Sequence, residues 1–428
     1  MMKQRIHRMI FMGLAALTLG LASCSKSVYN EETYQKIIRY LSPVDSVDQR
    51  HTWKLTETQT IRFHADTGSD LVALRVFSAN PLVYASGAEL MTQMEIGRGE
   101  TLTMSLSVPL LLTTLYGVLV DEQGNYYVKA FSPTDRDVYF TGATYGQPAV
   151  ATVPMTYTYL FEEDFPQAGD YDYNDLVLRI SMLRTGTKQV TINVTVSAVG
   201  GNYHMAGGIR LIGKRFQDVD SVRTTSGLSF NDGVPQGSLY MFDKTDMLLQ
   251  GRNNEALINL FVDAHWAMAF NASVEYGLFK RMKYNVANTD GTTYQQRAER
   301  TMSYIVYFNT ETGLNNFTLD SLDPFIITEY NGGRWETHLD QYRDAQVLFE
   351  YPVSTTIKDL PWALVVPDGR FKYAWEGVNI GFKKRTDTGV TALFGAYSTE
   401  GHAFGEWCEN YQSSLDWYQY PTSGQVYN

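Results

Sequence analysis

Apolar and polar residues alternate along most of this chain, in short runs that end at turn-forming residues. Two clear runs place an apolar residue at every second position: Leu102, Met104, Leu106 and Val108, and then Val190, Ile192, Val194 and Val196. Because successive side chains of a strand point to opposite faces, this spacing puts one face of each strand against a core. Tyr and Thr are frequent in these runs, as is typical of strands. The pattern predicts a mainly β protein.

An N-terminal β-sandwich is predicted over residues 51–135. Runs with strand character occupy residues 54–64, 71–77, 101–108, 115–120 and 126–131. The last two runs are joined by Asp-Glu-Gln-Gly-Asn, a plausible hairpin turn. Short strands at such close spacing are typical of a small sandwich. The next segment, residues 132–155, is rich in Gly and Pro and is predicted to be a linker or a crossover.

Residues 136–428 are predicted to form a second β-rich domain, a sandwich or jelly-roll-like fold. Its predicted strands occupy residues 176–183, 189–199, 207–212, 257–262, 302–308 and 325–330. Gly186 lies between the first two of these strands and predicts a hairpin there. Helix is scarce, with short helices expected only at residues 375–377 and 401–414. The fold class is therefore two β-sandwich or jelly-roll-like domains after a signal peptide.

The first 23 residues have the features of an export signal rather than of a folded element. Three basic residues precede a mostly apolar run at residues 9–21, which is shorter than the roughly 20 residues that a membrane span needs. Residues 21–24, Leu-Ala-Ser-Cys, resemble the lipobox of bacterial lipoproteins, so Cys24 is the expected lipidation site. The alternative is an ordinary secretory peptide. Residues 24–50 would form a lipidated tether with a short helix, which anchors the protein to the outer membrane.

Charge and cysteine content narrow the possible partners. The formal net charge is −11, and loss of the three basic residues of the signal peptide makes it −14. Nucleic acid is therefore excluded as a partner, since phosphate contacts need a basic patch. Once Cys24 carries lipid, only Cys408 remains, so no intrachain disulfide is available. An acidic exported protein can instead attract divalent cations.

An acidic loop at residues 161–175 is the strongest candidate for chemistry. Oxygen-bearing side chains recur there at alternate positions, with more carboxylates close by, and the candidate metal ligands are Asp170, Asp172, Asn174, Asp175, Glu162 and Glu163. Such ligands suit a hard cation, so Ca²⁺ is the expected cofactor. If the backbone is extended, Tyr171 and Tyr173 point the opposite way, into a core. An acidic turn held by hydrogen bonds alone is the alternative.

The loop does not have the spacing of an EF-hand. That motif needs Gly at the sixth position and Glu at the twelfth, whereas counting from Asp170 places Asp175 and Ser181 there. If Ca²⁺ binds, it therefore binds in a different kind of loop.

The run FEEDFPQAGDYDYNDLVLRI resembles the hallmark of the LruC-domain lipoproteins, a family of Bacteroidetes-type bacteria. Further segments resemble blocks of the same family, at residues 47–53, 322–326, 336–339, 360–376 and 404–418. The likeness spans about residues 47–428 and departs from the family pattern at Glu163 and Asp164. It implies an exported, β-rich lipoprotein without established chemistry, and it strengthens the expectation of Ca²⁺ at the acidic motif.

No recognised catalytic motif is present. The seven histidines show no HExxH spacing, and His338 and His265 are expected to be packed or capped side chains. The tryptophans could stack on sugar rings, but core packing is the stronger expectation. The sequence thus favours a non-catalytic cell-surface protein that acts in adhesion, glycan binding or scaffolding, with a glycan or a surface protein as partner. An enzyme acting on extracellular polysaccharide and a fimbria-like subunit are the alternatives.

Overall fold

The alternating runs form strands in the computed structural model of the protein, and the mainly β prediction is confirmed. The structure describes residues 44–165, 169–234, 246–269, 282–330, 332–351, 360–385 and 388–427. The predicted signal peptide, the Cys24 lipidation site and the short helix of the tether lie outside these ranges. Residues 43–428 form one compact unit. Within the described ranges, no helix has the length and apolar character needed to cross a membrane.

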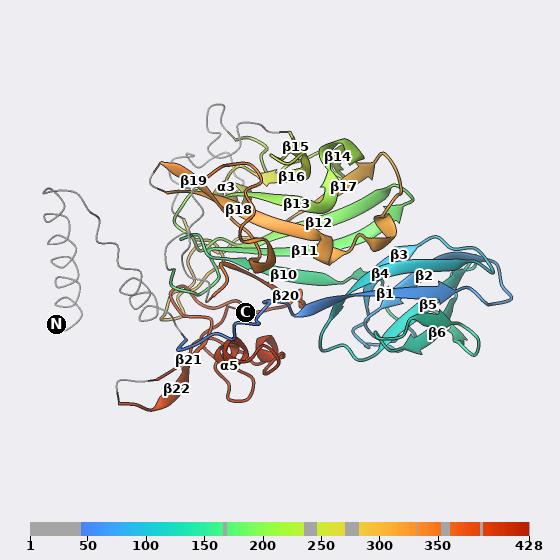
Figure 1. Ribbon diagram of the computed structural model, residues 1–428, viewed down its shortest axis with the longest axis horizontal. Helices are drawn as coiled ribbons and strands as arrows, with labels where there is room; N and C mark the ends of the chain where they lie inside the picture. Colours follow the sequence, from blue (N-terminus) through green and yellow to red (C-terminus); the bar gives the residue numbers. More distant parts are fainter. Residues whose placement is uncertain are drawn as a thin grey trace, which may run out of the picture. The chain divides into compact units, whose positions relative to one another are not determined.

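The first sandwich is built from β1 (Thr56–His64), β2 (Leu71–Phe77), β3 (Glu89–Met94), β4 (Thr101–Pro109), β5 (Leu115–Asp121), β6 (Tyr126–Phe131), β7 (Asp137–Tyr139), β8 (Thr144–Gly146) and β9 (Val153–Pro154). One sheet has the order β4-β1-β7 and the other β8-β6-β5-β2-β3-β9 (Figure 1). Alternate residues of each strand, such as Ile61 and Phe63 of β1 and Leu74 and Val76 of β2, share one buried core. The hairpin of β5 and β6 is present as predicted.

Residues 132–155, predicted to be a linker or a crossover, do cross between the two sheets, but they also form strands that were not predicted. This segment contributes β7, which pairs in parallel with β1, and also β8 and β9, which pair at the two edges of the six-stranded sheet. These strands are only two or three residues long. Their Gly and Pro content matches edge strands, which do not need a full ladder of hydrogen bonds. The sheets of the first sandwich therefore continue past residue 135, to Pro154.

The second sandwich is larger. Its strands are β10 (Thr156–Phe161), β11 (Leu176–Gly186), β12 (Gln189–Ala198), β13 (Ala206–Arg215), β14 (Val219–Thr224), β15 (Leu248–Gln250), β16 (Glu255–Phe261), β17 (Arg300–Phe308), β18 (Leu322–Tyr330), β19 (Gly333–Thr337) and β20 (Ala363–Val366). The sheet β14-β17-β12-β11-β10-β20 packs on the sheet β15-β16-β13-β18-β19. The predicted hairpin at Gly186 is present, because this residue pairs with Gln189.

A third layer, made of C-terminal segments, covers the outer face of β10, β11 and β20. It includes the two-stranded sheet of β21 (Phe382–Arg385) and β22 (Thr391–Phe394) and the helix α5 (Phe404–Glu409). Val177 of β11 is buried with Trp407 and Trp417 of this layer. Side chains of β11 thus reach two cores, one on each face of the sheet.

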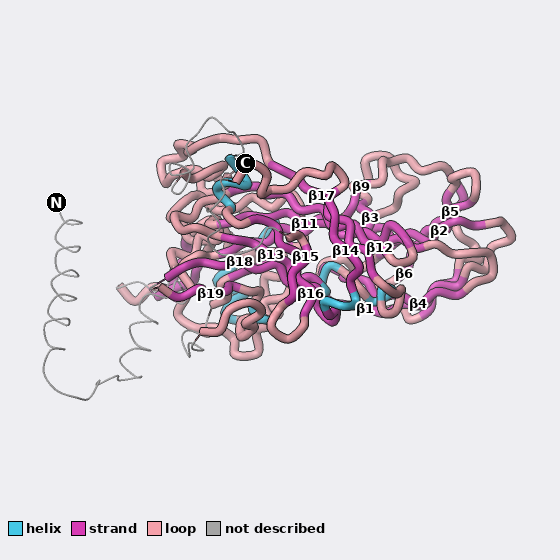
Figure 2. Tube along the Cα trace, turned by 90° about the horizontal axis from the view of Figure 1, so that it is seen from above, coloured by secondary structure: helices cyan, strands magenta, loops and turns pink. Residues whose placement is uncertain are grey.

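Within the described ranges, helix is confined to short segments (Figure 2). They are α3 (Ala264–Ala269), α5 and the 3-10 turns η2 (Phe216–Asp218), η3 (Leu314–Asn316), η4 (Leu319–Ser321), η5 (Asp340–Tyr342) and η6 (Trp417–Gln419). The helix expected within residues 401–414 is confirmed as α5. The helix expected at residues 375–377 is wrong, since this segment forms a turn in which Gly377 has a left-handed φ of 68°.

Polar contacts join the two sandwiches. Asp320 of η4 accepts hydrogen bonds from the hydroxyls of Thr56, Thr58 and Ser107, each at 2.8 Å. A second contact runs from the Asn315 side chain to the carbonyl oxygen of Thr103, at 3.4 Å. β4 is therefore covered along part of its edge by η3 and η4.

Candidate functional site

The acidic loop connects β10 and β11, which are antiparallel neighbours in the middle of the six-stranded sheet (Figure 1). The extended backbone considered in the sequence analysis is not found at Tyr171 and Tyr173, because both residues have left-handed φ angles, of 57° and 54°. Both tyrosines are nevertheless buried under the third layer, as predicted. The Tyr173 hydroxyl donates a hydrogen bond to the carbonyl oxygen of Pro361, at 2.6 Å. A strained backbone is thus held in place by the packing of its own aromatic side chains.

Glu162, Asp170 and Asp172 form the centre of the loop. One carboxylate oxygen from each lies within 4.8 Å of the others. Glu162 accepts hydrogen bonds from the backbone N–H groups of Tyr171 at 3.3 Å and Tyr173 at 2.7 Å, so the loop curls around this carboxylate. Glu162 and Asp172 are buried, whereas Asp170 is exposed. A cation at this centre would have one side open to solvent.

Asp172 also ties the loop to the C-terminal layer. Its carboxylate accepts hydrogen bonds from the backbone N–H groups of Asn174 at 3.1 Å and Gly377 at 2.6 Å. The Asn174 side chain donates to the carbonyl oxygen of Ala374, at 3.1 Å. The loop and residues 374–377 therefore hold each other in place, although they are about two hundred residues apart in the sequence.

Glu163 and Asp175 are turned toward a different segment. Glu163 accepts hydrogen bonds from the backbone N–H groups of Asn202 at 2.5 Å and Tyr203 at 2.8 Å. Its own N–H donates to Asp175, at 2.7 Å. These two carboxylates are thus not in the three-residue centre, and their contacts connect the acidic loop to the segment after β12.

Two buried oxygens beside the centre have no hydrogen-bond partner within the described part of the chain. They are Oδ1 of Asn174 and Oε2 of Glu376. Both lie close to the point that a Cβ on Gly200 would occupy, so they face the same small space. Leaving a buried acceptor unsatisfied costs about 1–3 kcal/mol, so a donor or a cation is expected there. Glu376 was not predicted as a site residue, because nothing in the sequence places the family-like block at residues 360–376 beside the acidic loop.

Burial and mutual repulsion disfavour the ionised form of the carboxylates in the loop. Burial, reinforced by the neighbouring carboxylates, raises the pKa of Glu162, Asp172 and Asp175 well above the ordinary range. Burial raises the pKa of Glu163 to about 7. Lys283 supplies a compensating charge through an ion pair with Glu376. A single lysine cannot balance this many carboxylates, so a bound cation would relieve the repulsion.

The donor set suits a hard cation. All the candidate ligands are carboxylate or amide oxygens, which is the set that Ca²⁺ takes and that Zn²⁺ sites seldom use alone. Gly169 and Gly200 leave room beside the oxygens, because a Cβ on either would collide with Glu162 or with Asn174. The residues present are therefore compatible with Ca²⁺, which Glu162, Asp170 and Asp172 would hold with Asn174 and Glu376 close by.

The two histidines singled out in the sequence are packed into hydrogen-bond networks. His338 is buried and contacts Asp323 through Nδ1 at 2.8 Å and Glu336 through Nε2 at 3.2 Å. Burial alone would lower the pKa of His338, but these two carboxylates outweigh it and raise the pKa to about 9. His265 is likewise buried, and its Nε2 donates to the carbonyl oxygen of Gly201 at 3.0 Å.

Most of the tryptophans singled out in the sequence pack in cores. Trp362, Trp407 and Trp417 are all buried. A role for these three rings in stacking on sugars is therefore not supported by their positions.

Residues 187–383 match the family model described as "Domain of unknown function (DUF4842)". This range includes the blocks at residues 322–339 and 360–376, and it begins after the acidic loop. No curated protein matches the chain.

One similar solved structure is a crystal structure of a "Putative lipoprotein from Bacteroides ovatus" at 2.08 Å resolution. The identity is 15%, the TM-score is 0.47, and the match covers 83% of this chain and 99% of the other.

Proposed function

We propose that this protein is a lipid-anchored component of the bacterial cell envelope that binds or supports other surface molecules without catalysis. The export signal and the Leu-Ala-Ser-Cys segment support the anchor at Cys24. The resemblance to the LruC-domain lipoproteins supports the same class, and an outer-membrane, surface-exposed location goes with it. Packed histidines and buried tryptophans favour a binding or scaffolding role over turnover.

The acidic loop is proposed to be a Ca²⁺ site. The observation that carries this proposal is the convergence of Glu162, Asp170 and Asp172 oxygens within 4.8 Å, beside the unsatisfied oxygens of Asn174 and Glu376. Ca²⁺ would give these buried carboxylates a counter-charge, and the unsatisfied oxygens could coordinate it. No reaction is assigned to the ion.

The structural consequence of the ion would be a brace. The loop connects the central strands β10 and β11, and its hydrogen bonds reach residues 374–377 of the third layer. A cation at this junction would connect segments that are distant in the sequence, and it would stabilise the folded protein outside the cell. Such ions stabilise the folded state because they bind it and not the unfolded chain.

The test is calorimetric titration of Ca²⁺ into residues 25–428, a span that contains the whole compact unit, together with thermal unfolding. Ca²⁺ at about a hundred times its Kd should add about 2.7 kcal/mol of stability. Asp172→Asn should abolish the binding heat, because it removes the negative charge of a buried ligand. Asp220→Asn, at an exposed carboxylate of β14, is the matched control and should bind as the parent does. Absence of both heat and a thermal shift in the parent protein would refute the Ca²⁺ site.

A further inference from the structure

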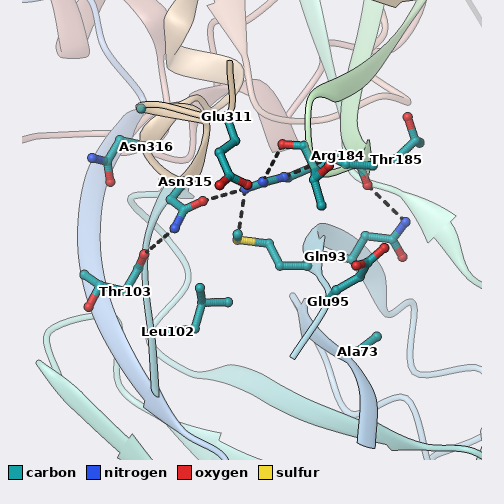
Figure 3. A pocket seen from close by; sticks show the side chains of 14 residues that line it. Ala73, Gln93, Glu95, Leu102, Thr103, Arg184, Thr185, Glu311, Asn315 and Asn316 are labelled. Atoms are coloured by element: carbon teal, nitrogen blue, oxygen red, sulfur yellow. Dashed lines mark hydrogen bonds between the residues drawn. The ribbon is translucent and has the colours of Figure 1, made fainter. Parts of the chain in front are cut away.

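A second candidate site lies at the junction of the two sandwiches, at the opposite end of β11 from the acidic loop. A cavity of about 740 Å³ opens there, within the size range of ordinary ligand pockets (Figure 3). One wall is formed by β2, β3 and β4 of the first sandwich. The other is formed by the β11–β12 turn and the segment around η3. Because β11 has 11 residues, the cavity lies about 30 Å from the acidic loop.

Arg184 fixes the two walls relative to each other. Its guanidinium donates hydrogen bonds to the carbonyl oxygens of Gly186 at 3.1 Å and Thr187 at 2.7 Å, to the Asn315 side chain, and to the sulfur of Met94 at 3.7 Å (Figure 3). The donors of Arg184 are therefore largely used within the protein. The cavity is therefore preformed, and Arg184 stabilises its walls rather than binding an anionic ligand.

The remaining polar groups of the cavity are rich in acceptors. Glu95 and Glu311 line it from opposite sandwiches, and both carboxylates attract the Arg184 guanidinium electrostatically, although no contact of 4 Å or less is seen between them in the described ranges. Thr103, Thr187 and Asn316 add hydroxyl and amide groups. The two carboxylates outnumber the one guanidinium in the lining, so the cavity disfavours an anionic ligand. The ligand must donate hydrogen bonds to Glu95 and Glu311 and also accept them from the neutral groups.

We infer that this cavity binds a short stretch of a neutral glycan. A sugar hydroxyl both donates and accepts, so vicinal hydroxyls can satisfy the carboxylates and the amide together, whereas an ammonium group can only donate. Ala73 and Leu102 provide an apolar patch for the C–H face of a sugar ring. The inference uses residues distant from the proposed cation site and does not depend on it.

The experiment is a glycan microarray followed by calorimetry with the neutral glycans that bind, using residues 25–428. Thr187→Trp should abolish binding, because Thr187 is exposed and a large ring there fills the cavity. Glu311→Gln should weaken binding roughly tenfold through loss of charged hydrogen bonds. Lys188→Trp, in the same turn but outside the lining, and Glu122→Gln, at an exposed carboxylate, are matched controls and should stay within about twofold of the parent.

Three outcomes would overturn the inference. They are failure of every neutral glycan to bind, binding of pentalysine in place of glycans, and undiminished glycan binding by Thr187→Trp. Thermal unfolding of each variant verifies that it is folded. Repeating the titration in EGTA separates the two proposals, since glycan binding is expected to persist when the cation is removed.

Discussion

Glu336 offers the most direct test of the physical argument in this fold. Its buried carboxylate accepts hydrogen bonds from three successive backbone N–H groups, those of Val347 at 2.6 Å, Leu348 at 2.7 Å and Phe349 at 2.8 Å. It also contacts His338. One carboxylate therefore holds the segment after η5 against β19.

The substitution Glu336→Gln keeps the side-chain volume and removes the charge. The amide oxygen can retain the Leu348 and Phe349 bonds, but the amide nitrogen then faces the N–H of Val347, which loses its acceptor. One unsatisfied buried donor costs about 1–3 kcal/mol, and the retained bonds weaken because they are no longer charge-assisted. The free energy of unfolding should therefore fall by about 3 kcal/mol, in the range for breaking a buried ion pair.

Urea unfolding followed by tryptophan fluorescence measures this change. Glu350→Gln is the matched control, because Glu350 lies in the same segment, is 81% exposed at its side chain and, among the described residues, pairs with Arg252 at the surface. Its effect should stay within about 0.5 kcal/mol. If Glu336→Gln costs no more than this control, the assignment of the carboxylate as a buried anchor is refuted.

Three further predictions follow from the same kind of reasoning. The folded-state pKa of His338 is raised to about 9, so its contribution to stability is complete below the unfolded-state pKa of about 6.5 and is lost as pH rises through 9. The free energy of unfolding should therefore fall by about 3 kcal/mol between pH 7 and pH 10. A free energy that does not change with pH would contradict this. Gly200→Ala should destabilise the protein by about 2 kcal/mol or more and impair Ca²⁺ binding, since the added Cβ would lie 2.8 Å from the Asn174 backbone oxygen. Gly68→Ala is the control, because a Cβ at Gly68 would have nothing within 4 Å, and it should be nearly neutral in thermal unfolding. Asp320→Ala removes the acceptor of three hydroxyl hydrogen bonds between the sandwiches, so limited proteolysis should cut the chain faster between them. An unchanged cleavage rate would show that these hydrogen bonds do not hold the sandwiches together.

The sequence by itself determined the strands whose pattern is local. The β5–β6 and β11–β12 hairpins follow from alternation within each strand and from the turn residues between them, so both were predicted close to their observed bounds. The strands that were not predicted are β3, β10, β14, β15, β19, β20, β21 and β22. β7, β8 and β9, in the segment predicted to be a linker or a crossover, were also missed, because two or three paired residues leave no periodic pattern and exist only through their neighbours in the sheet.

Tertiary structure decided how the candidate sites are composed. The acidic loop was visible as a motif, yet only the fold separates Glu162, Asp170 and Asp172 from Glu163 and Asp175, since hydrogen bonds to distant segments turn the carboxylates in different directions. Glu376 joins the loop from about two hundred residues away, and the cavity at Arg184 exists only where two sandwiches meet. Alternation and spacing record which face of a strand is buried, whereas distances between remote side chains are set by how the sheets and the C-terminal layer pack.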